Sequence, residues 1–342
     1  MIPIVRALER RRPGTVLLFD TQQQRELTPA LLSDYDLCAV PIVRIDCQRY
    51  SLASQLASQL MQLDDRIAGC VGVVVQGDTT STVAGALAGF YRGLPVVHVE
   101  AGLRSHDVSQ PFPEEMNRRL VSEIASLHLA PTKKARTHLL DCGINADSVA
   151  VVGNPLVDLC REVDGREPAP WDVLITMHRR ENRASGIKAL CRALDILAKQ
   201  NPLCRFAVIQ HSHPDVHGRF IHHLPRHANL VYIAPMTHRV FLKALSTSKL
   251  VMTDSGGVQE EAAMLGVATL ILRNVLDRED GIAAGSARLV GTQCDEIVIA
   301  ANQVLHDNAH FKPAGSIGQT RPGELIASRI LAYYALDQES AA

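Results

Sequence analysis

The chain has 342 residues, of which 46% are apolar and 21% charged, and single cores stop growing near about 250–300 residues, so two domains are expected. A net charge of −1 excludes a bulk attraction to nucleic acid or to an anionic membrane and favours a small polar ligand. The opening MIPIVRALERRR lacks the apolar core of a signal peptide, and no window approaches a membrane span of about 20 apolar residues, so the predicted location is the cytoplasm.

Helices and strands alternate through the first half of the chain. Runs such as 71–75 are apolar on both faces, which indicates parallel strands covered on both sides. The pattern predicts strands at 15–20, 71–75, 95–99, 127–130 and 149–152, and helices at 4–11, after Leu27, and at 52–67, 82–90, 114–124 and 132–141.

The pattern weakens between residues 155 and 171, where Gly165, Pro168 and Pro170 predict a linker. A second series follows, with strands expected at 173–177, 206–209, 230–233, 250–252, 269–272 and 287–290, and helices at 187–199, 238–246, 258–265, 296–305 and 324–336. The simplest architecture is α/β, with two Rossmann-like domains facing a cleft. The predicted domains are residues 1–158 and 172–323, with residues 324–342 as a helix that crosses back to the first domain.

Acidic residues follow two predicted strands of the first domain. Asp78 and Glu100 each come directly after an apolar run, at the strand ends where open α/β sheets bind ligands. Asp78 also suits the N-cap of the next helix, so both interpretations stay open. Glu114 and Glu115 follow Pro-Phe-Pro in the first turn of a helix, where the helix dipole favours acids whatever their role.

Two stretches of the second domain carry donors suited to an anion. The run TDSGGVQEE at 253–261 follows a strand and opens a helix at Ser255, where glycines let backbone N–H groups approach a phosphate. The run TMHRREN at 176–182 offers His and Arg donors for a diphosphate, or forms a surface charge cluster. Together with the acids, these strand-end clusters favour a nucleotide-diphosphate ligand and acid–base chemistry on the group it carries.

Cysteine and histidine give no metal signature. The eight cysteines have no Cys-x-x-Cys spacing and are interpreted as free residues in a reducing compartment. Seven histidines lie between His211 and His238 without cysteine or carboxylate at ligand spacing, so the interpretation is a solvated loop and helix and no metal site.

Six motifs in this order carry a resemblance: GDTTST, HVEAGLRS, PFPEEMNRR, VVGNPLVD, MHRREN and TDSGGVQEEA. Over about residues 1–292 the chain resembles the non-hydrolysing bacterial UDP-N-acetylglucosamine (UDP-GlcNAc) 2-epimerases. The resemblance implies an isomerase with a GT-B-type fold, a homodimer, a UDP-sugar substrate converted between UDP-GlcNAc and UDP-N-acetylmannosamine (UDP-ManNAc), no cofactor and no metal. It also implies elimination of UDP to a bound 2-acetamidoglucal and re-addition, with carboxylates moving the C2 proton.

The family's site residues are carried over by position in these motifs. The resemblance assigns catalysis to Asp78, Glu100, Glu114 and His178; UDP binding to Arg179, Ser255, Gly256, Gly257, Glu261 and Arg278; and contacts with a UDP-GlcNAc activator to Gln23, Arg180 and His211.

The chain departs from the family pattern in three places. Family members begin with a strand ending in Gly-Thr-Arg-Pro-Glu, whereas this chain starts at the following helix, so the first strand is expected to be missing. The run RNVLDRED at 273–280 keeps Arg273 and Arg278 but loses a Thr and a Pro, and TRPGE at 320–324 replaces Asn-Pro-Tyr-Gly-Asp-Gly. The alternatives are a hydrolysing epimerase that releases UDP and N-acetylmannosamine, or an impaired protein that binds a sugar nucleotide without turnover.

Overall fold

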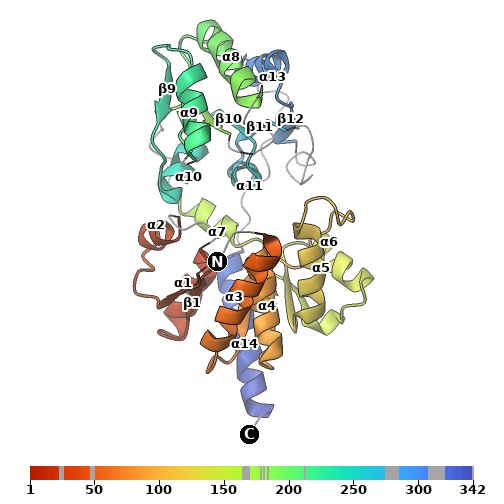
Figure 1. Cartoon of the computed structure of the whole chain (residues 1–342). Coiled ribbons are helices and arrows are strands. Elements are labelled where there is room, and N and C mark those ends of the chain that lie inside the picture. The colour runs from red at the N-terminus through yellow and green to blue at the C-terminus, as the bar shows by residue number, and fades with distance from the viewer. Residues whose placement is uncertain are drawn as a thin grey trace. The chain divides into compact units, whose positions relative to one another are not determined.

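The computed structural model describes residues 1–22, 27–46, 51–163, 170–177, 179, 182, 185–211, 213–273, 285–306 and 320–340. The chain folds into two compact units, each with its own strands and helices (Figure 1). Unit 1 comprises Met1–Asp158 with Thr320–Ala342, and unit 2 comprises Leu159–Gln319.

Unit 1 is built from short parallel strands and the helices that connect them. Its strands form two separate parallel sheets, one of order β1-β2 and one of order β3-β4-β5-β6. The strands are β1 (Leu18–Asp20), β2 (Ile42–Arg44), β3 (Val73–Gln76), β4 (Val96–Val99), β5 (Leu127–Ala130) and β6 (Val149–Val151). The helices are α1 (Ile2–Arg11), α2 (Leu27–Asp34), α3 (Leu52–Arg66), α4 (Thr80–Tyr91), α5 (Glu114–Ile124), α6 (Lys133–Asp141), η1 (Ala146–Ser148) and α14 (Pro322–Ser340), and α7 (Leu156–Arg161) contains the boundary at Asp158.

Helix α14 packs on α1 and on the β3-β4 sheet, although more than 300 residues separate it from α1. Buried Ile4 of α1 and Ile326 of α14 share one hydrophobic cluster with Val97 of β4. The Tyr334 ring lies so close to Gly72 that a Cβ there would sit 2.1 Å from a ring carbon, so only glycine fits at position 72. The last helix is therefore part of the core of unit 1.

Unit 2 contains one six-stranded parallel sheet of order β12-β11-β10-β7-β8-β9. Numbered within the unit, this order is the doubly wound 6-5-4-1-2-3, whose switch point lies between β7 and β10. The strands are β7 (Val173–Thr176), β8 (Phe206–Ile209), β9 (Leu230–Ile233), β10 (Leu250–Thr253), β11 (Ala268–Ile271) and β12 (Ala287–Leu289). The helices are α8 (Ser185–Gln200), α9 (Pro214–His223), α10 (His238–Ser246), α11 (Gly256–Leu265) and α13 (Cys294–His306).

The predicted α/β class, with parallel strands buried on both faces, is confirmed. Four elements among the described residues were not predicted. They are the three-residue strand β2, whose exposed–intermediate–exposed pattern gives no apolar run; the short 3-10 helix η1; α7, which occupies the start of the predicted linker; and α9, which lies in the histidine-rich stretch. Within the described part of the chain, no helix is long and apolar enough to cross a bilayer, and no cluster of three or more His, Cys, Asp or Glu side chains could hold a metal ion. The described cysteines are all free.

Candidate active site

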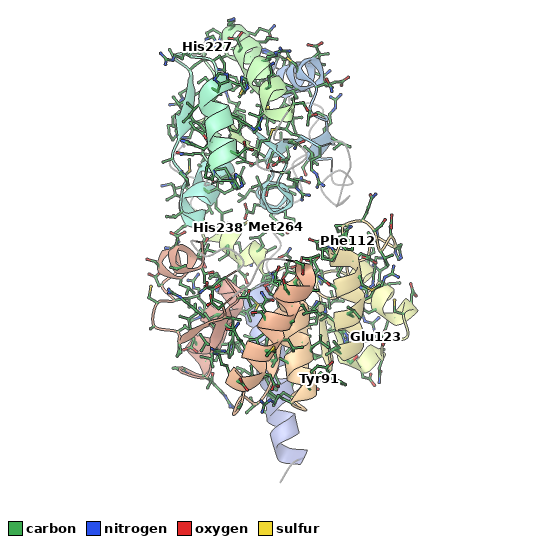
Figure 2. The ribbon with its side chains drawn as sticks, viewed as in Figure 1. Tyr91, Phe112, Glu123, His227, His238 and Met264 are labelled. Carbon is green, nitrogen blue, oxygen red and sulfur yellow. The ribbon has the colours of Figure 1, made fainter. Side chains whose placement is uncertain are left out.

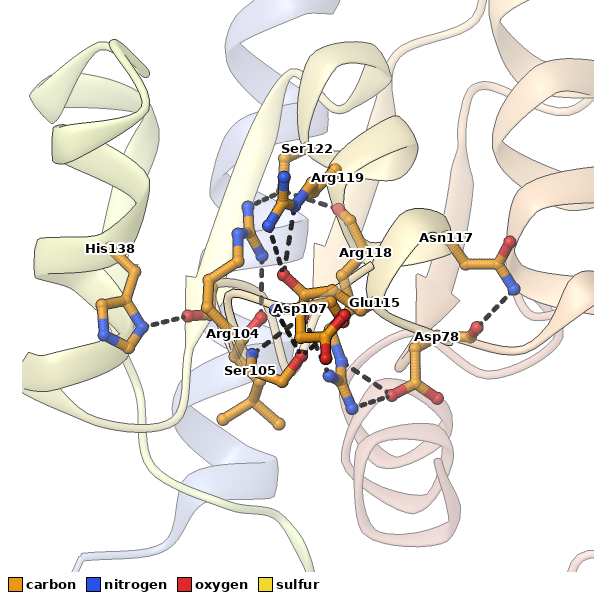
Figure 3. Close-up of polar contacts among 12 residues, drawn as sticks. Asp78, Arg104, Ser105, Asp107, Glu115, Asn117, Arg118, Arg119, Ser122 and His138 are labelled. Atoms are coloured by element: carbon orange, nitrogen blue, oxygen red, sulfur yellow. Dashed lines mark hydrogen bonds and ion pairs between the residues drawn. The ribbon is translucent and has the colours of Figure 1, made fainter. Parts of the chain in front are cut away.

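Asp78 follows β3 through Gly77 and is tied to helix α5 (Figure 3). Its carboxylate Oδ2 accepts a hydrogen bond from Arg118 Nε at 2.9 Å and forms an ion pair with Nη2 at 2.6 Å. Its backbone carbonyl accepts a further hydrogen bond from Asn117 Nδ2 at 2.7 Å. The N-cap of α4 is Thr79, so Asp78 is not the helix cap that the sequence left open.

Glu100 follows β4 in a left-handed conformation, with φ of 64°, which is uncommon for a residue with a side chain and costs on the order of 1 kcal/mol. Gln76 Nε2 donates to its Oε2 at 3.3 Å. No helix starts after Glu100 until α5, so this acid is not a helix cap either. Gln76 pairs with Val99 in the β3-β4 ladder, and Asp78 and Glu100 therefore lie at the same carboxyl edge of the sheet.

Glu114 and Glu115 open α5 in two different environments. Glu114 is half-buried and its carboxylate has no hydrogen bond or ion pair with a described residue. Glu115 is fully buried: Oε2 accepts from Ser105 N–H at 2.9 Å and Arg118 Nη1 at 3.3 Å, and Oε1 from Arg119 Nε at 3.1 Å. Burial raises the pKa of Glu115, but these donors outweigh burial and the net pKa is lowered. Glu115 is thus committed to internal contacts, whereas Glu114 is not.

In unit 2 the loops after β7 and β10 are joined through Asp254. These strands are neighbours in the sheet, with Thr176 opposite Thr253. Asp254 is fully buried, and its Oδ2 accepts from the Arg179 backbone N–H and from Asn182 Nδ2, both at 2.9 Å. Arg179 Nε also donates to the Asp254 carbonyl at 3.1 Å. Two stretches that are far apart in the sequence are therefore held together at the switch point.

Helix α11 begins beside this junction with Ser255 as its N-cap, and the Ser255 side chain makes no capping hydrogen bond. A Cβ added at Gly256 or Gly257 would meet nothing within 4 Å, so internal packing does not require glycine at either position. One turn on, buried Glu261 lies with Oε1 2.8 Å from His238 Nε2 of α10. The N-terminus of α11 therefore has no side-chain cap, whereas the Glu261 carboxylate one turn further along the helix is bound by His238.

His211 lies just past the end of β8, and its Nδ1 accepts the His213 backbone N–H at 3.0 Å. The remaining assigned residues, Gln23, His178, Arg180 and Arg278, lie outside the described residues.

Known proteins are similar to this chain both in sequence and in fold. The family model for UDP-N-acetylglucosamine 2-epimerase matches residues 6–326. The UDP-N-acetylglucosamine 2-epimerase of Neisseria meningitidis serogroup A is 33% identical over 341 residues, which cover 93% of this chain and 90% of that protein. This chain belongs to the UDP-N-acetylglucosamine 2-epimerase family.

Solved structures share the fold. The Staphylococcus aureus MnaA–UDP co-structure matches with a TM-score of 0.86 at 32% identity, covering 98% of this chain and 93% of that one. The N. meningitidis UDP-GlcNAc 2-epimerase bound to UDP-GlcNAc matches with a TM-score of 0.83 at 32% identity, covering 98% and 96%. The resemblance stated from the motifs is confirmed, and so is the two-domain Rossmann-like fold.

Several residues that organise the site in this protein were given no role from sequence. Arg118, Asn117 and Glu115 all stand in the PFPEEMNRR motif, and the Glu115–Arg118 spacing of three residues was a usable signal for a helical ion pair. Asp254 and Asn182 stand in two further motifs. No local signal connects them, because they are 72 residues apart in the chain.

Proposed function

We propose that this protein interconverts UDP-GlcNAc and UDP-ManNAc by the non-hydrolysing route, as an isomerase that retains UDP through the reaction. The observation that carries the proposal is the placement of Asp78 and Glu100 at the ends of two paired parallel strands, within a family whose N. meningitidis member has been solved bound to UDP-GlcNAc. The same chemistry applies to a related UDP-2-acetamido sugar.

The proposed route has two steps. A carboxylate takes the C2 proton, the C2–H electron pair forms the C1=C2 double bond, and the C1–O pair leaves with UDP. A diphosphate oxygen then attacks C1 of the bound 2-acetamidoglucal while an acid returns a proton to C2 on the opposite face. Asp78, Glu100 and Glu114 are the proposed acid–base groups, since carboxylates in different environments can take the two opposite roles. The route moves protons and a leaving group without net oxidation, so it calls for no nicotinamide.

Unit 2 is proposed to hold UDP. The open N-terminus of α11 at Ser255, Gly256 and Gly257 offers backbone N–H groups to an anion, and the S. aureus relative has been solved with UDP. His178, Arg179 and Arg278 are proposed to contact the diphosphate, and Glu261 the ribose.

Deuterium exchange tests the proposal. The protein is incubated with UDP-GlcNAc in heavy water, and the recovered UDP-sugars are examined by proton NMR for deuterium at C2 and for UDP-ManNAc. We expect both, together with scrambling of an ¹⁸O label from the bridging to the non-bridging β-phosphate oxygens, because the C1–O bond breaks and re-forms. Accumulation of free N-acetylmannosamine and UDP would identify a hydrolysing enzyme. Tight UDP-GlcNAc binding by calorimetry without label would identify a binding protein.

Regulation and assembly are proposed from the resemblance. A second UDP-GlcNAc molecule is the proposed activator, with Gln23, Arg180 and His211 as its contacts, and the expected form is a cytoplasmic homodimer. Sigmoidal dependence of initial rate on UDP-GlcNAc that becomes hyperbolic in His211→Ala would support the activator site. Sedimentation at the mass of one chain would contradict the dimer.

A further inference from the structure

Arg118 lies between two carboxylates that the chain brings together from different elements (Figure 3). Its Nε and Nη2 reach Asp78 Oδ2, at the end of β3, and its Nη1 reaches Glu115 Oε2, one turn back on its own helix. The Arg118 side chain is 9% exposed and that of Glu115 0%. A guanidinium so nearly buried is held in place by both partners.

We infer that Arg118, anchored by Glu115, is a positioning residue that fixes the rotation of the Asp78 carboxylate for transfer of the C2 proton. The inference rests on the proposed function and goes beyond it, because neither Arg118 nor Glu115 belongs to the assigned acid–base or UDP-binding groups.

The hydrogen-bond pattern supports a positioning role. Both Arg118 contacts are made to Oδ2, and Oδ1 accepts no hydrogen bond from any residue that the structure describes. Asn117 Nδ2 holds the backbone carbonyl of the same residue, and His98 Nε2 lies 2.9 Å from the carbonyl of Gly77 just before it. Backbone and side chain of Asp78 are thus fixed together, and a single carboxylate oxygen stays available for a substrate.

The charge balance explains how the Arg118 guanidinium can keep its position when Asp78 gains or loses a proton. Glu115 contacts Arg118 and also Arg119, so the four side chains form a chain of alternating charge with no net charge when all are ionised. If Asp78 takes a proton, Arg118 keeps its buried partner Glu115 and need not move. A lone Asp–Arg pair would instead lose its only counter-charge at that step.

Arg119 provides a matched control. It lies next to Arg118 on α5 and contacts the same buried Glu115 through Oε1, but it does not touch Asp78, and its side chain is 42% exposed. A general loss of α5 stability would appear in Arg118 and Arg119 variants alike. A positioning effect on Asp78 would appear in Arg118 variants alone.

The experiment compares wild type, Arg118→Met, Arg118→Lys and Arg119→Met in full-length protein. For each, kcat and KM are measured with UDP-GlcNAc and with UDP-GlcNAc deuterated at C2, and UDP affinity is measured by calorimetry. Because a displacement of about 1 Å in a reacting group can cost about 100-fold in rate, we expect Arg118→Met to lower kcat by about 100-fold with KM and UDP affinity within about threefold. The primary isotope effect on kcat is expected to rise in Arg118→Met, since proton removal becomes rate-limiting. Arg118→Lys is expected to recover about tenfold of the loss, and Arg119→Met to stay within about threefold of wild type.

Three outcomes overturn the inference. Wild-type turnover with an unchanged kcat in Arg118→Met removes the positioning role and leaves the proposed function standing. If kcat falls equally in Arg118→Met and Arg119→Met and the isotope effect does not rise, the two arginines act only through the stability of the protein. Absence of C2 exchange in wild type removes the proposed function, and this inference with it.

Discussion

The two units hold acidic residues at equivalent strand ends but use them differently. In unit 1, Asp78 is 17% exposed and is held from one side by a guanidinium, so one carboxylate oxygen remains uncommitted among the described residues. In unit 2, Asp254 is fully buried and its Oδ2 binds a backbone N–H and an amide that close one loop onto another. A carboxylate after a parallel strand can thus react with a substrate or hold two loops together, and its hydrogen-bond partners determine which role it has.

The anchor of the unit 1 network is expected to show the largest effect. Glu115→Ala removes a buried carboxylate that accepts hydrogen bonds from Ser105, Arg118 and Arg119, so the free energy of unfolding should fall by about 3–5 kcal/mol. Urea denaturation combined with hydrogen exchange of α5 amides measures this loss and places it in unit 1. Glu123→Ala, at an exposed position on the same helix (Figure 2), should change stability by less than about 0.5 kcal/mol. A loss below about 1 kcal/mol for Glu115→Ala would show that the network does not support unit 1.

The buried His98 of β4 should make unit 1 sensitive to acid. Burial lowers the pKa of His98 from 6.5 to about 4, so the unfolded chain binds more protons between these values. Stability is therefore lost as pH falls from about 6.5 to about 4, by about 3 kcal/mol from this group. In His98→Gln, whose amide can still donate to the Gly77 carbonyl, that part of the pH dependence should disappear.

Urea titrations at several pH values between 4 and 7 measure the difference between the wild type and His98→Gln. The exposed His106, in the loop after β4, supplies the control His106→Gln, which should keep the wild-type pH dependence. Parallel pH profiles for wild type and His98→Gln would mean that His98 is not held neutral in the folded protein.

The sequence predicts where strands end better than it predicts the hydrogen-bond partners of the acidic side chains at those ends. Apolar runs located β3, β4, β7 and β10, and with them the positions of Asp78, Glu100 and Asp254. Whether Asp78 caps a helix could not be decided locally, because Arg118 is 40 residues further along the chain. The burial of Asp254 depends on donors 72 and 75 residues away, which only the folded sheet brings near.

Substitution by asparagine should separate the two kinds of acid. In Asp254→Asn the new carbonyl oxygen can accept the same two hydrogen bonds, so the expected cost is about 1–2 kcal/mol from the lost charge. UDP affinity should stay within about threefold, while Asp78→Asn should stop C2 exchange with stability nearly unchanged. Calorimetry with UDP and the deuterium assay measure both. Loss of UDP binding in Asp254→Asn would mean that its charge, and not its geometry, organises the loops.

The smallest effect is expected at His238, which holds Glu261 in unit 2 (Figure 2). His238→Gln removes the histidine partner of Glu261, a mostly buried carboxylate that is proposed to contact the ribose of UDP. A single hydrogen bond contributes about 1 kcal/mol, so loss of the bond that orients Glu261 should weaken UDP binding by about fivefold. The rate of C2 proton transfer at saturating substrate should not change, because Glu261 takes no part in that step. His222→Gln, at an exposed position on α9, should leave both quantities unchanged. If His238→Gln instead lowers kcat with UDP affinity intact, the division of binding to unit 2 and proton transfer to unit 1 is wrong.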